Sequence, residues 1–239
     1  MSTSYPSVVF TTCPQYTYCT WPMATCGLKL LSLKTSFLVA ITSAKWASEL
    51  AALRSDPPFL QFHPDKVTLY FDVSFLPKVV SEFHLSQPII LPTLFPSLST
   101  PLKSMLHTLD VRRSLGFYIY RTKSFRKSQR LFLRFHGPHK GAPASPQSIS
   151  RWIVQTISLV YELTSKTPPE HLKAHSTRAL SASTAFQCGV KLLHICHAVT
   201  WSTPSTFVRH YHLDVRAQND AGFGRAVWAS FLVWRPTIR

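Results

Sequence analysis

The sequence predicts a mainly helical α+β domain with a small antiparallel sheet in its N-terminal third. Apolar residues recur at helical spacing in several segments, for example from Cys26 to Ala44 and from Ser145 to Ser165. Between these two segments, Val67, Leu69 and Phe71 alternate as the buried residues of a strand do. A chain of 239 residues with 45% hydrophobic content can bury one substantial core, so we expect one main domain.

The N-terminal third begins with residues 1–23, which mix Ser, Thr, Pro and aromatic residues without a helical or strand period. We expect a poorly ordered leader there. A helix is predicted from Cys26 to Ala44 and a second, short helix from Ala47 to Arg54. The proline pair that follows ends this helix, and extended pieces are expected around Val67, from Phe75 to Val80 and from Pro88 to Leu91.

The middle of the chain is predicted to be helical on both sides of a short strand. Thr100 to Arg121 starts with a Thr cap and a Pro at the first helical position, and it has apolar residues at helical spacing. We expect one long amphipathic helix there, then a short strand from Leu131 to Phe135. Gly137 to Pro146 is a loop by its Gly and Pro content, and the helix from Ser145 to Ser165 follows.

The last third should contain three helices and a tail. After a second proline pair, helices are expected around His175 to Gln187, around Lys191 to Val199 and from Ser205 to about Arg216. Ala221 to Trp234 is predicted to be a final apolar helix or tail. The expected division is therefore a leader at 1–23, a domain at 24–216 and a C-terminal segment at 217–239.

The charge of the chain favours a polyanionic partner. Lys and Arg number 26 against 10 acidic residues, a formal net charge of +16, which is more than solubility requires. No acidic residue occurs between Asp110 and Glu162. A run of this kind can be a solvated face or a flexible basic loop, but with the whole-chain charge it favours nucleic-acid contact. The candidates for DNA contact are Arg112, Arg113, Arg121, Lys123, Arg126, Lys127, Arg130 and Lys140.

Cysteine usage and hydropathy indicate a soluble intracellular protein. The five cysteines form an odd set without framework spacing, which favours reduced thiols. The apolar run from Leu28 to Ala44 carries Lys29 and Lys34 and is too short to cross a bilayer. We therefore expect no membrane association.

Polar groups gather in an otherwise apolar helical pattern between His171 and Val215. His175 and Arg178 are three residues apart, so on a helix they would project from one face. Arg178 could grip two phosphate oxygens in a fork geometry, and His175 could donate a hydrogen bond or shuttle a proton. Tyr211 could act as a nucleophile if such cations stabilise the phosphate that it attacks. The alternative is an ordinary helix N-terminus with exposed polar groups.

Two rival interpretations concern the same half of the chain. Cys188, His194, Cys196, His197, His210 and His212 form a Cys/His-rich set, but without a paired frame zinc is disfavoured and no metal site is predicted. Several aromatic residues among the basic ones could stack on bases, although core packing is the usual role of such residues. These are Phe117, Tyr118, Tyr120, Phe125 and Phe132.

Several segments together resemble a known family. AHSTRAL at Ala174 to Leu180 is similar to the His-x-x-Arg box of tyrosine recombinases, the phage-integrase type of DNA strand-exchange enzyme. Four further segments, SLKTSFLVAITSA, DPPFLQFHPDKVTL, FLPKVVSEFHLSQPIILP and TWSTPSTFVRHYHLDV, resemble the recombinase of DIRS-type vertebrate retroelements more closely. The resemblance covers roughly Ala24 to Ser230.

The resemblance implies a set of site residues. The family combines a first Arg, a hairpin Lys, the His-x-x-Arg pair, a His or Trp and a Tyr nucleophile. By position the hairpin lysine is Lys78, with Lys66 as the alternative, and the remaining residues are His175, Arg178, Trp201 and Tyr211. In AKWASEL the position of the first Arg holds Trp46, with Lys45 beside it. An indole lacks the charged donors of a guanidinium, and adjacent helical positions point about 100° apart, so Lys45 is a poor substitute.

The resemblance also implies the fold and the activity. The fold would be a tyrosine-recombinase-like catalytic domain, and the activity would be DNA strand cleavage and rejoining through a 3′-phosphotyrosyl intermediate, impaired by Trp46. The alternative is a catalytically inactive DNA-binding or protein-interaction relic of a retroelement. The expected partner is double-stranded DNA, with no cofactor, and a homo-oligomer could assemble on it. DNA integration and a nuclear location are further expectations.

Overall fold

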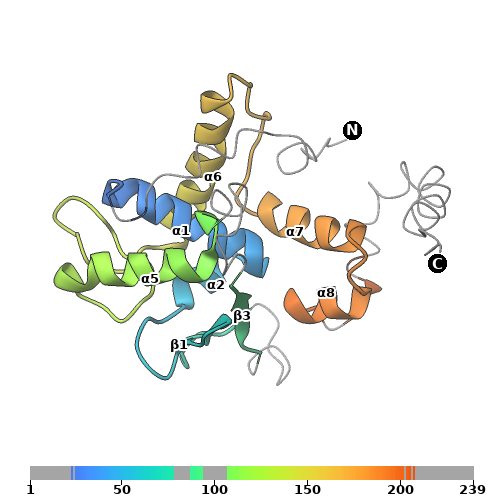
Figure 1. Ribbon diagram of the computed structural model, residues 1–239, viewed down its shortest axis with the longest axis horizontal. Coiled ribbons are helices and arrows are strands. Elements are labelled where there is room, and N and C mark those ends of the chain that lie inside the picture. Colours follow the sequence, from blue (N-terminus) through green and yellow to red (C-terminus); the bar gives the residue numbers. More distant parts are fainter. Residues whose placement is uncertain are drawn as a thin grey trace, which may run out of the picture.

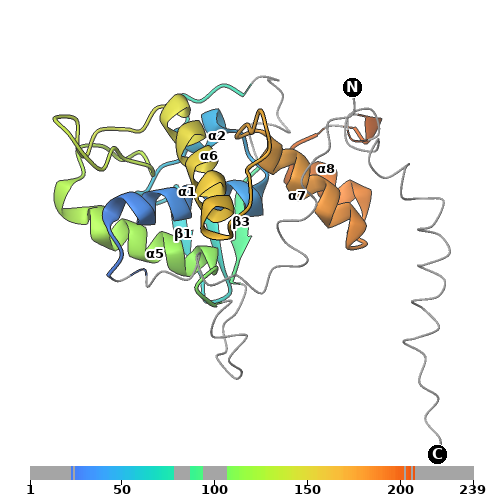
Figure 2. The same ribbon diagram turned by 90° about the horizontal axis from the view of Figure 1, so that it is seen from above.

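The computed structural model describes residues 23, 25–77, 87–93, 107–201, 203–205 and 207. It is mainly helical, with one three-stranded antiparallel sheet, and this confirms the predicted fold class. Helix α1 lies at the centre, the sheet lies below it in the view of Figure 1, and α7 and α8 lie together on the side away from α5 in both views (Figures 1 and 2). No helix in the described part of the chain combines the length and apolar character needed to cross a bilayer.

Helix α1 (Leu28–Ser43) is the central element of the core and packs against α5, α6 and α7. Its small polar residues are buried together with its apolar ones because their hydroxyls are hydrogen-bonded. The Thr35 and Ser114 hydroxyls, for example, lie 2.8 Å apart and join α1 to α5. The helix ends at Ala44, whose φ of 52° is left-handed, and α2 (Ala47–Ala52) starts three residues later.

The sheet has the order β1-β2-β3, with β1 at Leu60–Phe62, β2 at Lys66–Leu69 and β3 at Ile89–Pro92. Thr68 pairs with Gln61 on one side and with Ile90 on the other. The predicted strands around Val67 and from Pro88 to Leu91 are therefore present. Strand β1 was not predicted, since only three residues form it.

Helices α5 (Val111–Thr122) and α6 (Pro146–Leu163) flank α1, with the short 3₁₀ helix η2 (Lys123–Phe125) after α5. Ser145 caps α6 by accepting a hydrogen bond from the backbone N–H of Ser148, with Pro at the first helical position. The loop between these helices is held by Arg126, which donates hydrogen bonds to the Ser55 hydroxyl and to the Leu131 carbonyl.

Helices α7 (Ser176–Gln187) and α8 (Leu192–Ala198) pack on each other around a second, smaller apolar cluster. Ala182, Ile195, Val199 and Phe207 are its buried residues, together with Ala44 at the end of α1. This cluster therefore joins the α7–α8 pair to the end of the central helix. The predicted positions of both helices are confirmed.

Two of the predicted elements were wrong. The helix expected from Thr100 to Arg121 is interrupted before Val111, because the Asp110 side chain caps a new helix by accepting from the backbone N–H of Arg113. Residues 131–135 form no strand; only isolated bridges link Leu133 to Pro143 and Arg130 to Arg54. The extended piece predicted from Phe75 to Val80 shows no strand at residues 75–77, and its remainder lies outside the described residues.

Candidate active site

Four segments, the first two adjacent in the sequence and the other two distant from them, meet at the end of α1. They are the connection from α1 to α2, the first turn of α2, the start of α7 and the turn after α8. Lys45 and Trp46 come from the first segment, His175 and Arg178 from the third and Trp201 from the fourth. The fold therefore brings together five of the residues that the sequence singled out.

Arg178 is buried at the centre of this cluster, with 4% of its surface exposed. Its Nη1 donates a 2.8 Å hydrogen bond to the carbonyl oxygen of Ala44 and lies 3.6 Å from Oε2 of Glu49. Its Nη2 donates to the carbonyl oxygen of Val199. The guanidinium thus ties α7 to the end of α1 and to the turn after α8.

Two indole rings enclose the same guanidinium. The Cζ atom of Arg178 lies 5.1 Å from the centre of the Trp46 ring and 5.5 Å from the centre of the Trp201 ring. Both distances are within the range of a cation–π interaction. Trp46 is 42% exposed, and the centre of its indole lies 6.2 Å from that of the exposed His175 ring. The outer surface of the cluster is therefore formed by Trp46 and His175, with Arg178 behind them.

Lys45 enters the cluster from the interior. It is 3% exposed, and its Nζ donates a 3.2 Å hydrogen bond to the Thr200 hydroxyl and lies 3.9 Å from Oε1 of Glu49. Burial lowers the pKa of Lys45 to about 8; Glu49 opposes this shift, and the positive charge of Arg178 adds to it. Lys45 and Trp46 lie in the connection between α1 and α2 rather than on a helix, and their side chains occupy different environments.

Glu49 organises the charges of the cluster. Its Oε2 accepts a 2.7 Å hydrogen bond from the backbone N–H of Trp46 and so caps α2. The same carboxylate faces both Lys45 and Arg178. Glu49 is not among the residues predicted for the site, although a Glu three residues after a helix start is a recognised capping signal.

Two residues that the resemblance assigns to the site, Lys78 and Tyr211, lie outside the described residues. Lys66, the alternative hairpin lysine, opens β2, and its carbonyl oxygen accepts a 2.9 Å hydrogen bond from the backbone N–H of His63. Lys78, Tyr211 and Lys66 therefore keep their roles as predictions.

Several of the candidate DNA-contact residues make internal contacts. Arg112 donates to the carbonyl oxygen of His63, and Arg121 donates to those of Met23 and Cys26. Arg126 holds the loop before α6, Arg130 donates to the carbonyl oxygen of Ala52, and Arg113 lies over the Phe117 ring. The exposed candidates are Lys123, Lys127 and Lys140, and the Nζ of Lys140 lies over Phe125. The basic window thus contains both structural and exposed cations.

The Cys/His-rich set and the aromatic residues of the basic window lie mostly apart from a binding arrangement in the described part of the chain. Within the described residues, no group of three His, Cys, Asp or Glu side chains gathers as metal ligands would. His210 and His212 lie outside these residues. Of the aromatic candidates for base stacking, Tyr118 and Phe132 are buried in the core, whereas Tyr120 is 77% exposed.

Comparison with known proteins supports the fold. No protein-family model matches the chain, and no curated protein matches it. Two similar solved structures are XerH site-specific recombinase bound to a palindromic difH substrate in a post-cleavage complex, and XerH bound to a difH substrate in a pre-cleavage complex. Their TM-scores are 0.57 and 0.55, each at 11% sequence identity, and the matches cover 90% and 85% of this chain.

The matches cover only 53% and 49% of the two recombinase chains, so this chain spans about half of their length. At this level of identity the comparison shows the fold. The chain has a tyrosine-recombinase-like fold, as the sequence resemblance implied.

Proposed function

We propose that this domain binds double-stranded DNA and cleaves one strand through Tyr211, at a strongly reduced rate. One observation carries the proposal. On a tyrosine-recombinase-like fold, His175, Arg178 and Trp201 gather around the position where the first Arg of that family would lie. The net charge of +16 favours the DNA partner.

In the proposed step, the phenolic oxygen of Tyr211 attacks a backbone phosphorus and forms the new P–O bond. The bond between that phosphorus and the 5′ oxygen breaks, so the DNA keeps a 3′-phosphotyrosyl link. The proton released by Tyr211 is balanced by the proton that the leaving 5′ oxygen takes up to become a hydroxyl, with His175 able to relay it. Attack by the 5′ hydroxyl reverses these bond changes and rejoins the strand.

The reduced rate follows from the two positions at which the family has an arginine, Trp46 and Arg178. Trp46 provides no guanidinium, and the loss of one transition-state donor or of an arginine finger costs on the order of 10²- to 10⁵-fold in rate. Arg178 is present, but its terminal nitrogens donate to Ala44 and Val199 and two indoles cover it. Phosphate binding by Arg178 would require it to exchange these contacts.

A second candidate function is a DNA-binding module without catalysis. The burial of Arg178, which is 4% exposed, favours this alternative, because a guanidinium used to pin three segments can be retained for stability alone. The two functions differ in one observable product, the covalent link between Tyr211 and DNA.

The test is a suicide substrate, a duplex with a nick beside the cleavage position, so that a cleaved strand diffuses away and traps the adduct. We expect a slow protein–DNA adduct with the wild type and none with Tyr211→Phe. Salt-sensitive duplex binding without an adduct would support the second candidate function, DNA binding without catalysis. Absence of duplex binding at low salt would refute both functions.

We also propose that the chain derives from a DIRS-type retroelement recombinase, acts in the nucleus and can assemble as an oligomer on DNA. The resemblance of the segments quoted above supports the origin, and DNA as the partner supports the location. Imaging of a fluorescent fusion in vertebrate cells tests the location, and light scattering of the duplex complex tests the assembly.

A further inference from the structure

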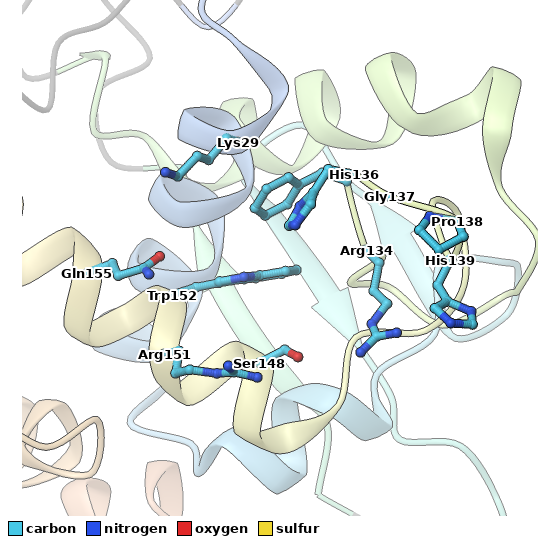
Figure 3. A pocket seen from close by; sticks show the side chains of 11 residues that line it. Lys29, Arg134, His136, Gly137, Pro138, His139, Ser148, Arg151, Trp152 and Gln155 are labelled. Carbon is cyan, nitrogen blue, oxygen red and sulfur yellow. The ribbon is translucent and has the colours of Figure 1, made fainter.

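An open pocket of about 810 Å³ lies between the N-terminal half of α6, the first turn of α1 and the loop at residues 134–139 (Figure 3). We call it the α6 pocket. Its lining residues include Lys29 of α1, Arg134 and His139 of the loop, and Arg151 and Trp152 of α6. None of them belongs to the Arg178 cluster, so the α6 pocket is a separate feature of the fold.

The α6 pocket carries positive charge that is not neutralised within the structure. None of the described residues that line it is acidic. Lys29, Arg134 and Arg151 are exposed, and they form no ion pair with any residue that the structure describes. By contrast, Arg112, Arg121, Arg126 and Arg130 donate to protein carbonyl groups. The cations of the α6 pocket are therefore available for an external anion.

Rigid elements hold these cations around an aromatic floor. Trp152 is 7% exposed, and its ring centre lies 5.2 Å from that of Phe135. In the view of Figure 3, Lys29 lies on one side of the Trp152 ring and both arginines lie on the other. Arg134 stands in a loop whose backbone is closed by hydrogen bonds from Arg134 N–H to Ala142 and from Gly141 N–H to Arg134. The fold thus sets the backbone positions from which these cations reach the pocket.

We infer that the α6 pocket binds the phosphodiester backbone of duplex DNA, at phosphates distinct from the one held at the Arg178 cluster. The inference rests on the DNA binding proposed above. Three exposed cations at one open pocket can neutralise several phosphates of a polyanion, and arginine matches phosphate in a bidentate fork. A membrane surface would require exposed apolar anchors beside the cations, whereas here the tryptophan forms the floor.

The test compares the salt dependence of duplex binding by the wild type and by Arg134→Gln/Arg151→Gln. The slope of log K against log salt is expected to fall by about 1.8 in the double variant, since each lost phosphate contact removes about 0.9. Affinity should fall on the order of tenfold at low salt. Lys166→Gln/Lys191→Gln removes two exposed charges outside the pocket, and we expect it to leave the slope nearly unchanged.

Arg134→Lys/Arg151→Lys provides a second variant that keeps the charge. It should retain the wild-type slope while losing part of the affinity, because lysine cannot form the bidentate contact. All variants change exposed side chains, and circular dichroism with thermal unfolding verifies that each is folded.

The outcomes separate this inference from the proposed function. If the wild type binds duplex DNA and Arg134→Gln/Arg151→Gln has the same salt slope, the α6 pocket does not bind DNA. The proposed DNA-binding function would then remain intact. An equal fall in slope in the Lys166/Lys191 variant would also overturn it, because total charge would then be the cause. If the wild type binds phosphatidylserine vesicles through Arg134 and Arg151 but does not bind duplex DNA, both the role of the α6 pocket and the proposed function are wrong.

Discussion

The guanidinium of Arg178 lies 5.1 Å from the centre of the Trp46 indole, and this pair occupies the place where the resemblance would put two arginines. In the described structure Arg178 is covered by Trp46, the residue that the resemblance places at the position of the first arginine. The contact stabilises the charge of Arg178 through the face of the ring. It also places an exposed indole over a guanidinium that is itself buried.

Trp46→Arg should increase the rate of covalent adduct formation on a nicked suicide substrate by on the order of 10²-fold or more. The substitution removes the indole from one face of Arg178 and adds a second guanidinium at a position that is 42% exposed. The backbone N–H of residue 46 still donates to Glu49, so the cap of α2 is kept. Denaturing gel electrophoresis of the trapped adduct gives the rate.

Trp46→Gln is the matched control for this prediction. It uncovers Arg178 without adding a charge, so we expect little gain in adduct from it. A gain as large as that of Trp46→Arg would show that the covering ring, rather than the missing cation, limits the reaction.

Arg178→Met should lower the free energy of unfolding by about 3–5 kcal/mol, even in the absence of DNA. The substitution leaves the carbonyl groups of Ala44 and Val199 without their donor and removes one of the two cations that face Glu49. Urea unfolding measures the change. His175→Ala, at an exposed position, should change the stability by no more than about 0.5 kcal/mol. Equal stability of Arg178→Met and the wild type would assign Arg178 to phosphate contact alone.

Lys45 should make the stability of the protein increase with pH between about 8 and 10.5. Its pKa is about 8 in the folded state and about 10.5 when exposed, so within this window the unfolded chain binds more protons than the folded one. Stability therefore rises with pH there, by at most about 3.5 kcal/mol, because one pKa unit corresponds to about 1.4 kcal/mol. Below the window both states are protonated and Lys45 adds no slope.

Lys45→Met should remove this contribution. Urea unfolding at several pH values, compared between the wild type and Lys45→Met, isolates Lys45 from the other groups that titrate in the same range. Parallel curves for the two proteins would show that Lys45 keeps an ordinary pKa.

Arg126→Gln and Lys123→Gln should separate structural cations from exposed ones in the basic window. Arg126 donates to Ser55 and Leu131, so its loss should lower the stability by about 1–3 kcal/mol. Lys123 is exposed, and its loss should leave the stability within about 0.5 kcal/mol while lowering the salt slope of duplex binding by about 0.9 if it contacts a phosphate. A loss of stability in Lys123→Gln but not in Arg126→Gln would show that Lys123, and not Arg126, is the structural cation.

Much of the fold could be predicted from the sequence because its helices follow local signals. Proline pairs and apolar periodicity placed α1, α2, α6, α7 and α8 close to their observed bounds. The break before α5 was missed because its signal, the cap at Asp110, stands within a continuous helical pattern. The apolar run at residues 131–135 predicts a strand, because a buried segment without strand pairing has the same pattern.

Less of the site could be predicted from the sequence. The spacing of His175 and Arg178 predicts neighbours on one helical face, but His175 is exposed and Arg178 is buried. That difference depends on Ala44, Glu49 and Val199, which come from segments far from Arg178 in the chain. Likewise, the DNA contacts predicted from the acid-free window include Arg126, which donates to protein carbonyl groups, and omit the exposed Arg134, because only the fold decides which cation finds a carbonyl group.

The enclosure of Arg178 by two indoles gives this centre an intrinsic optical signal. The chain has six tryptophans, and two of them, Trp46 and Trp201, contact one guanidinium. Movement of that guanidinium toward a phosphate would change the surroundings of both rings at once. Tryptophan emission, followed with single replacements to assign each ring, would therefore report in real time whether Arg178 leaves its resting position when DNA arrives.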